Sequence, residues 1–148
     1  GSDGDDFSVG GDQPWCTRGR LFVGGAGSGD VVQGALGDCW FLGALSVLAT
    51  RQDLLEQVFW RGGAWQERGL FVCRFFKDAA WHFVVVDDRV PCFANGGPAF
   101  ARCRDPDELW VPLLEKAYAK LHGSYKALIG GYAHYALADL TGRPPLGL

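Results

Sequence analysis

Several features that would place the chain in a functional class at once are missing from its sequence. No apolar run approaches the roughly 18 residues that a membrane-spanning helix needs. The chain does not open with the charged, apolar and small-residue series of a signal peptide. Lysine and arginine are scattered and the formal net charge is -3, so no basic stripe suits nucleic acid. These absences favour a soluble, unsecreted protein with no transmembrane segment and no nucleic-acid partner.

The cysteines lack the spacing of a metal site. They include no CxxC pair, and no histidine cluster at zinc spacing accompanies them. The five positions are Cys16, Cys39, Cys73, Cys92 and Cys103. An odd number of widely spaced cysteines favours reduced thiols, so we expect a cytoplasmic, intracellular location.

What is present suffices for one globular core, since 48% of the 148 residues are hydrophobic. Residues 1–12 are acidic and glycine-rich and are predicted to form a flexible lead. Arg143-Pro144-Pro145 breaks any helix and marks a boundary. Residues 13–142 are therefore predicted to form the domain, and residues 143–148 to begin a linker.

The hydrophobic patterns predict an α+β fold in which helices accompany a small antiparallel sheet. Nearly continuous apolar residues make the first predicted helix a buried one. The predicted helices span residues 38–49, 52–59, 105–121 and 132–140. The predicted strands span residues 69–76, 81–86 and 89–92, the first two joined by a turn at Lys77-Asp78.

The third predicted helix carries expectations of its own. Asp105 is assigned as its cap and Pro106 as its first residue, and Pro112 is expected to bend or loosen its start. An apolar stripe recurs along it at helical spacing. The side chains off this stripe, which we predict to form a solvated face, are Glu115, Lys116 and Lys120.

Two further groups of residues have simple structural interpretations. Trp40, Trp81 and Trp110 fall on predicted inward faces and are expected in the core. Trp40 also flanks Cys39 and could wall a cleft. Asp87 and Asp88 follow three valines and precede a proline, which indicates a strand end and a turn rather than a metal pair.

Cys39 has the surroundings of a reactive thiol. It stands where a glycine-rich turn enters the buried helix, and the positive end of the helix dipole favours the thiolate, which is the attacking species. Asp38 opposes ionisation, so an imidazolium partner is needed. The side-chain amide of Gln33 can fold back to join the Cys39 N–H in an oxyanion hole. Alternatively, Cys39 is a buried small hydrophobe, as most isolated free cysteines are.

The segment Gln33-Gly34-Ala35-Leu36-Gly37-Asp38-Cys39-Trp40 resembles the nucleophile motif of the calpain family. Further matching blocks run in family order from about Trp15 to Gly142. They are Val86-Asp87-Asp88 before Pro91, Leu109-Trp110, Leu114-Glu115-Lys116-Ala117-Tyr118-Ala119-Lys120, Gly123-Ser124-Tyr125 and Asp139-Leu140-Thr141-Gly142. The resemblance implies the left-hand subdomain of a papain-like fold, with Cys39 as nucleophile at the N-terminus of the central helix and Gln33 as oxyanion donor.

The resemblance also implies that the catalytic histidine and asparagine lie on a second subdomain of the same parent chain. The histidines present, His82, His122 and His134, do not fit that role and are predicted at the surface or the core edge. The chain is then a fragment of a calcium-dependent endopeptidase that acts on protein substrates. We predict that it is inactive alone.

A calcium site follows from the same resemblance, with the carbonyls of Val23 and Gly25 and the carboxylates of Asp30 and Glu108 as ligands. Alternatively, Glu108 closes a capping box with Asp105, and Asp30 closes a turn. Ser28 stands where many calpains have an arginine that reaches toward the second subdomain, so cleft closure could be coupled differently.

A second interpretation belongs to another functional class. The chain could be a non-catalytic, calpain-like module for calcium sensing or protein association. Cys39 and Gln33 favour the enzyme, because a module without catalytic demand could easily have lost either residue.

Overall fold

We describe the fold from a computed structural model of the chain. It describes residues 15–16, 19–24, 30–34, 36–92 and 99–143. The α-helices are α1 (Cys39–Leu48), α2 (Gln52–Val58), α3 (Trp110–His122) and α4 (Ala133–Thr141), and the 3-10 helices are η3 (Gln66–Arg68) and η4 (Lys126–Leu128). The strands are β1 (Trp15–Cys16), β2 (Val31–Val32), β3 (Leu70–Lys77), β4 (Ala80–Asp87), β5 (Val90–Pro91) and β6 (Arg102–Cys103).

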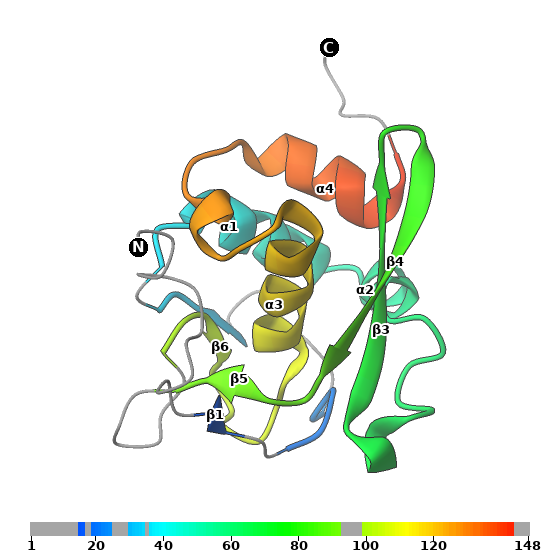
Figure 1. The fold of residues 1–148 in the computed structure, drawn as a ribbon, viewed down its shortest axis with the longest axis vertical. Helices are drawn as coiled ribbons and strands as arrows, with labels where there is room; N and C mark the ends of the chain where they lie inside the picture. The colour runs from blue at the N-terminus through cyan, green and yellow to red at the C-terminus, as the bar shows by residue number, and fades with distance from the viewer. Residues whose placement is uncertain (1–14, 17–18, 25–29, 35, 93–98, 144–148) are drawn as a thin grey trace.

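These elements confirm an α+β architecture with small antiparallel sheets. β3 and β4 form a long hairpin in which Leu70 pairs with Asp87 and Lys77 with Ala80. β1 pairs with β5, and β2 pairs with β6. In Figure 1 the hairpin stands along one side of the helices. The short strands β1, β5 and β6 lie near the start of α3. The third predicted strand is therefore real, but it pairs with β1 instead of extending the hairpin.

The hairpin turn lies one residue later than predicted. Its two central residues, Asp78 and Ala79, have φ of 53° and 62°. Positive φ at both central positions is the geometry of the turn that matches strand twist in two-residue hairpins. Lys77 is left as the last paired residue of β3.

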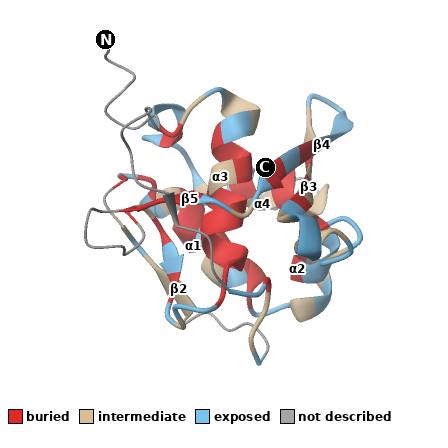
Figure 2. Ribbon diagram, turned by 60° about the horizontal axis from the view of Figure 1, so that its bottom comes forward, coloured by how far each residue is buried: buried red, intermediate tan, exposed pale blue. Residues whose placement is uncertain are grey.

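The core lies between α1, α3 and the inner face of the hairpin. α3 is buried along most of its length, as Figure 2 shows in red. The Phe41 ring stacks on Tyr118 with centroids 4.4 Å apart, and Phe75 of β3 meets the same tyrosine at 5.3 Å. Aromatic packing through Tyr118 thus holds α1, α3 and β3 together.

Tyr118 also carries a polar link from α3 to α4 and β3. Its hydroxyl donates to Asp139 Oδ2 at 2.6 Å, and Lys77 Nζ lies 3.1 Å from the same oxygen. Burial, together with the neighbouring carboxylate, raises the pKa of Tyr118 well above its usual range. The phenol therefore stays a donor, and the buried Asp139 has two partners.

α3 begins later than the sequence predicted. Its first residue is Trp110, and Asp105 does not cap it; the Asp105 carboxylate accepts the N–H of Asp107 instead. Pro112 thereby falls in the first turn, where a backbone N–H has no acceptor within the helix. The reason for expecting a bend or a loose start at Pro112 disappears.

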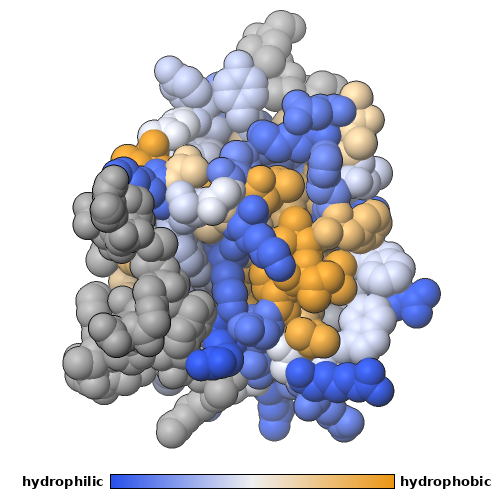
Figure 3. Space-filling view, viewed as in Figure 1, coloured by the Kyte–Doolittle hydropathy of each residue, from blue (hydrophilic) through white to orange (hydrophobic). Residues whose placement is uncertain are grey.

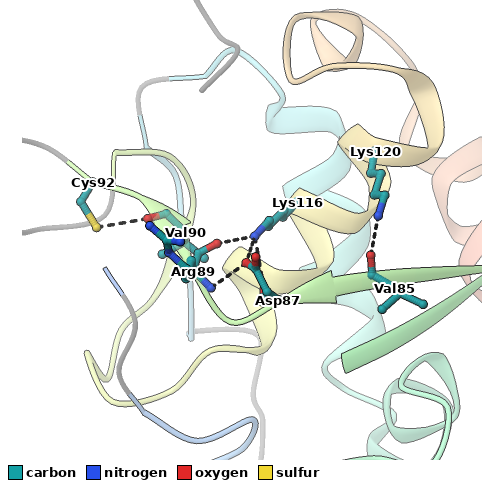
Figure 4. A network of polar contacts seen from close by, with 7 residues as sticks. All are labelled: Val85, Asp87, Arg89, Val90, Cys92, Lys116 and Lys120. Carbon is teal, nitrogen blue, oxygen red and sulfur yellow. Dashed lines mark hydrogen bonds and ion pairs between the residues drawn. The ribbon is translucent and has the colours of Figure 1, made fainter. Parts of the chain in front are cut away.

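The predicted solvated face of α3 is wrong at Glu115, which is only 1% exposed. Lys116 is half-buried, and its ammonium group donates to the carboxylate and carbonyl of Asp87 and to the carbonyl of Arg89 (Figure 4). Lys120 is exposed and donates to Val85 O at 2.7 Å. These lysines tie α3 to the end of β4.

Asp87 and Asp88 confirm the strand-end interpretation. Asp87 is the last residue of β4, and the Asp88 N–H donates to Gly69 O at 2.9 Å. Burial alone would raise the pKa of Asp87. The hydrogen bonds from Lys116 and the Arg89 N–H outweigh it, so the pKa is lowered.

Trp81 corrects a second core prediction. Trp110 is fully buried and Trp40 half-buried, whereas 36% of Trp81 is exposed. Alternation along β4 sends Trp81, Phe83 and Val85 to the outer face. Figure 3 shows the resulting apolar patch over the hairpin. The Arg74 guanidinium covers the Trp81 ring at 4.2 Å from the centroid.

The expectation that all cysteines are reduced fails at Cys92, which is disulfide-bonded. Its sulfur lies 3.4 Å from Val90 O. A disulfide sulfur has no proton to donate, so this contact is van der Waals packing. Cys39, Cys73 and Cys103 are free.

No helix in the described part of the chain is both long enough and apolar enough to cross a membrane.

Candidate active site

The chain turns from β2 into α1 through a segment anchored at both ends. β2 is held by its antiparallel pairing with β6. Leu36 is 1% exposed and fixes the turn in the core. The Asp38 carbonyl accepts the N–H of Leu42 at 3.1 Å, so α1 begins at Cys39.

Cys39 is an exposed, free thiol at the first residue of α1. The N–H groups of a first helical turn have no acceptor within the helix, and the positive end of the dipole lies there. Cys73 and Cys103 differ, because burial raises the pKa of both thiols, that of Cys103 to about 12. Among the described free cysteines, Cys39 alone is exposed and so open to a substrate.

Gln33 lies across the same turn. Its side chain is exposed, and Nε2 donates to Leu36 O at 3.4 Å. The next residue must be glycine, because a Cβ on Gly34 would stand 2.1 Å from the carbonyl oxygen of Phe100. The segment is thus closely packed at Gly34, while the side chains of Gln33 and Cys39 on either side of it are exposed.

Trp40 turns away from the thiol and into the fold. Its indole N–H donates to Leu128 O at 2.7 Å, and a Cβ on Gly131 would stand 2.7 Å from the ring. The indole therefore fixes the approach of the chain to α4. The ring as a whole is half-buried.

Three of the residues proposed for calcium, Val23, Asp30 and Glu108, lie near one another just before α3. Glu108 is 3% exposed, and its Oε2 accepts the N–H of Val23 at 2.7 Å. The capping-box alternative is wrong, since the Glu108 carboxylate bonds to Val23 and α3 starts at Trp110. Burial raises the pKa of Glu108, and the charges of Asp30 and Asp105 add to the rise.

The electrostatics of this group suit a divalent cation. Three carboxylates act on one another, and carboxylate and carbonyl oxygens are the ligands that calcium prefers. Gly25 and Ser28 lie outside the described residues. Among those described, no three His, Cys, Asp or Glu side chains are arranged to hold a metal ion. The side chains fit calcium in chemistry, and backbone carbonyls would complete the set.

Comparison with known proteins gives the family. The family described as "Calpain family cysteine protease" matches residues 12–146. The chain belongs to this family. It is 52% identical over 122 residues to "Calpain-type cysteine protease ADL1" of Oryza sativa subsp. japonica, a match that covers 82% of this chain and 6% of that protein.

Animal calpains match in the same way. Calpain-10 of Mus musculus is 48% identical over 134 residues, covering 88% of this chain and 20% of the relative. The calpain-2 catalytic subunit of Gallus gallus is 43% identical over 129 residues, covering 86% and 18%. The chain thus spans a fifth or less of the length of these calpains.

The histidines of this calpain chain lie at the surface or the core edge, as predicted. His82 and His134 are exposed, and His122 is half-buried with Nδ1 2.9 Å from Tyr118 O. In the described residues, no hydrogen bond joins a histidine to Cys39. The surface or core-edge interpretation is confirmed for all three.

One residue that sequence reasoning missed lies directly behind the thiol. Glu115 of α3 reaches the buried carboxyl of Asp38, the residue before Cys39, and its Oε1 accepts the N–H of Ala101 at 3.0 Å. A signal existed in the spacing, since Glu115 stands four residues after Val111 and three before Tyr118, which are both buried.

A cavity near α2 does not include the thiol. Its volume is about 640 Å³, and Phe22, Phe59, Trp60 and Arg74 are among its walls. None of the predicted site residues lines it. Cys39 lies outside this cavity and is exposed.

Proposed function

We propose that the chain supplies the first catalytic subdomain of a calcium-dependent cysteine endopeptidase. The observation that carries the proposal is the exposed, free thiol of Cys39 at the N-terminus of α1, with the exposed side chain of Gln33 in the segment that leads to it. Protein substrates and the second subdomain of the parent chain are its proposed partners.

In the proposed reaction, the Cys39 sulfur attacks a peptide carbonyl carbon. Negative charge then develops on the carbonyl oxygen, where the Cys39 N–H and the Gln33 side-chain amide can both donate to it. An imidazole from the second subdomain takes the thiol proton and returns it to the departing amine. Water then hydrolyses the thioester and frees the thiol.

Labelling by a thiol-reactive epoxide tests the nucleophile. We expect mass spectrometry to find the label on Cys39 when the second subdomain is supplied, and none on Cys39→Ser. The isolated chain should not hydrolyse a fluorogenic peptide, because the imidazole is missing. Cleavage by the isolated wild-type chain would contradict the two-subdomain proposal.

A variant of Gln33 tests the oxyanion hole separately. Removing one such donor typically lowers the rate about 10²–10³-fold. We expect Gln33→Ala to lose activity by that factor in the reconstituted enzyme while its melting temperature stays close to wild type, because Gln33 is exposed. An unchanged rate would remove Gln33 from the mechanism.

Calcium is proposed as the cofactor of the same subdomain. The carboxylates of Asp30 and Glu108 and the carbonyls of Val23 and Gly25 would hold it. The support is the buried Glu108 carboxylate turned to the Val23 N–H, with Asp30 adding negative charge. A chain that binds calcium but is never labelled in the reconstituted enzyme would instead be the non-catalytic module.

A cytoplasmic location remains part of the proposal, because a free thiol nucleophile persists in a reducing compartment. The disulfide at Cys92 instead favours an oxidising compartment. Counting free thiols in protein purified from cells without reductant separates the two. Five alkylated cysteines in the unfolded protein correspond to a broken disulfide, and three to an intact one.

A further inference from the structure

Three buried carboxyl oxygens behind Cys39 have no hydrogen-bond donor. They are both oxygens of Asp38 and Oε2 of Glu115. Asp38 is fully buried and Glu115 is 1% exposed. Two ionised carboxylates so placed would repel each other in a site that water does not reach, which is strongly unfavourable. Neither has a lysine or arginine partner among the described side chains.

We infer that Asp38 and Glu115 share one proton at neutral pH and that this hydrogen-bonded acid pair positions the turn that carries Cys39 and Gln33. The inference rests on the proposed function for its catalytic meaning, but not for its chemistry. Glu115 is the protonated member, and its carboxyl O–H donates a hydrogen bond to the Asp38 carboxylate. The pair therefore carries a single negative charge.

The geometry identifies the oxygen that carries the shared proton. Glu115 Oε1 already accepts the Ala101 N–H at 3.0 Å, so Oε2 is the oxygen free to carry the proton. The remaining charge then lies on Asp38, the N-cap residue of α1, where the positive end of the helix dipole stabilises an anion. The direction of the shifts agrees with this: burial and the neighbouring Asp38 raise the pKa of Glu115 well above its usual value.

The pair connects three elements at the thiol. Asp38 belongs to the start of α1, Glu115 to α3, and Ala101 to the segment before β6. Phe100, next to Ala101, places its carbonyl where a Cβ on Gly34 would be. Glu115 therefore holds both sides of the turn that presents Gln33 and Cys39. It is a positioning residue, since it touches neither the thiol nor the open surface.

Few other titratable groups face the pair. Tyr125, from the segment after α3, has its pKa raised well above its usual range by burial and by the charges of Glu115, Asp38 and Asp87. It stays neutral and adds no charge. Cys39 is the chain neighbour of Asp38 on the solvent side.

Infrared spectroscopy of the whole chain tests the shared proton directly. At pH 7 we expect the wild type to show the carbonyl stretch of a protonated carboxyl group, and Glu115→Gln to lack it. Glu56→Gln, an exposed glutamate on α2, is the matched control and should keep the band. A wild type without the band, or a band that survives in Glu115→Gln, would overturn the inference.

Unfolding against pH gives a second readout. A raised pKa means that the folded state binds more protons, so stability falls as pH rises above the unfolded value near 4.5 toward the folded one. We expect the melting temperature of Glu115→Gln to fall less over this range than that of wild type or Glu56→Gln. Equal slopes in all three would contradict a shared proton.

The positioning role is tested by alkylation of Cys39 with iodoacetamide. Glutamine can donate to Asp38 and accept from Ala101 as the protonated acid does, so Glu115→Gln should react at the wild-type rate within about 2-fold. Glu115→Ala should depart from it further. If Glu115→Gln does not fold, Asp38→Asn replaces it, because its amide supplies the missing donor and should also remove the infrared band.

The two proposals fail in different ways. If the reconstituted enzyme is never labelled at Cys39 but the infrared band is present and lost in Glu115→Gln, the acid pair stands and the protease function falls. If labelling succeeds and the band is absent, the protease stands and the shared proton falls.

Discussion

Two groups of carboxylic acids flank the segment that leads to Cys39, and they differ in how their repulsion is relieved. Asp38 and Glu115 are almost completely buried, and three of their four oxygens have no donor. Asp30 and Asp105 are only half-buried, and the buried Glu108 beside them already accepts a backbone N–H. The first group can be neutralised only from within, whereas the second includes two carboxylates that solvent, and therefore a cation, can reach.

The comparison shows that burial decides whether a proton or a metal cation can neutralise a group of carboxylates. A cation that enters a site must shed water and needs an access path, which a fully buried pair does not offer. A proton needs neither. We therefore expect the acid pair to respond to pH and the outer group to respond to calcium, and the predictions below are ordered by the size of the expected effect.

The largest effect should come from removing one member of the buried pair. Glu115→Ala leaves the Ala101 N–H and the Asp38 charge without their partner, and it opens a cavity in α3. Breaking a buried pair in this way typically costs about 3–5 kcal/mol. Urea denaturation should show a fall in the free energy of unfolding of that order. Glu56→Ala is the control and should stay close to wild type, and an equal loss in both variants would contradict the contrast in burial.

The outer group should respond to calcium instead. At a free calcium concentration about 100 times the dissociation constant, binding to the folded state adds about 2.7 kcal/mol to stability. The melting temperature should therefore rise with calcium in the wild type and in Glu115→Gln, and it should not rise in Asp30→Ala. A calcium-dependent rise that persists in Asp30→Ala would move the site elsewhere, and no rise in the wild type would remove it.

A buried carboxylate with donors of its own gives an intermediate case. Asp139 accepts from Tyr118 and lies beside Lys77. Tyr118→Phe keeps the ring packing and removes one hydrogen bond to a charged group, a loss of about 1.5–3 kcal/mol. Chemical denaturation measures it. A neutral result would mean that Lys77 alone satisfies Asp139.

The smallest effect is expected at the exposed carboxylate Asp87. Lys116→Ala removes an ion pair in which half of the Asp87 side chain is exposed, so solvent screening limits the loss to about 0.5 kcal/mol. Because the pKa of Asp87 is lowered in the fold, this contribution is present above its ordinary pKa of 3.8 and is lost as pH falls through the lowered value. The difference between the melting temperatures of wild type and variant should shrink in acid. A difference that grows instead would contradict the assignment.

The local sequence pattern was sufficient to predict secondary structure in segments whose contacts are mainly with residues nearby in the chain. The helix at Cys39 and the hairpin of β3 and β4 follow from apolar runs and turn residues, and the structure has both. The start of α3 did not follow. Asp105 and Pro106 have the composition of a helix start, but the segment pairs with distant residues first, since Arg20 N donates to Asp107 O at 2.7 Å.

Trp81 and Glu115 show the same limit for single side chains. An aromatic residue was expected inside and a carboxylate outside, and each is on the other side. Trp81 lies on the outer face of β4 because side chains alternate along a strand, and Phe83 and Val85 lie on the same face. Glu115 is buried because its partner is Asp38, the N-cap residue of α1, which lies more than 70 positions earlier in the chain.

By itself, the sequence determined the family resemblance, the thiol at the mouth of a buried helix and the alternation of helices with a hairpin, because each is written in a short run of residues. The tertiary structure decided which acids are buried, which donors reach them and which side of the hairpin meets solvent. Those properties depend on contacts between segments far apart in the chain, and side-chain burial and charge are set by such contacts.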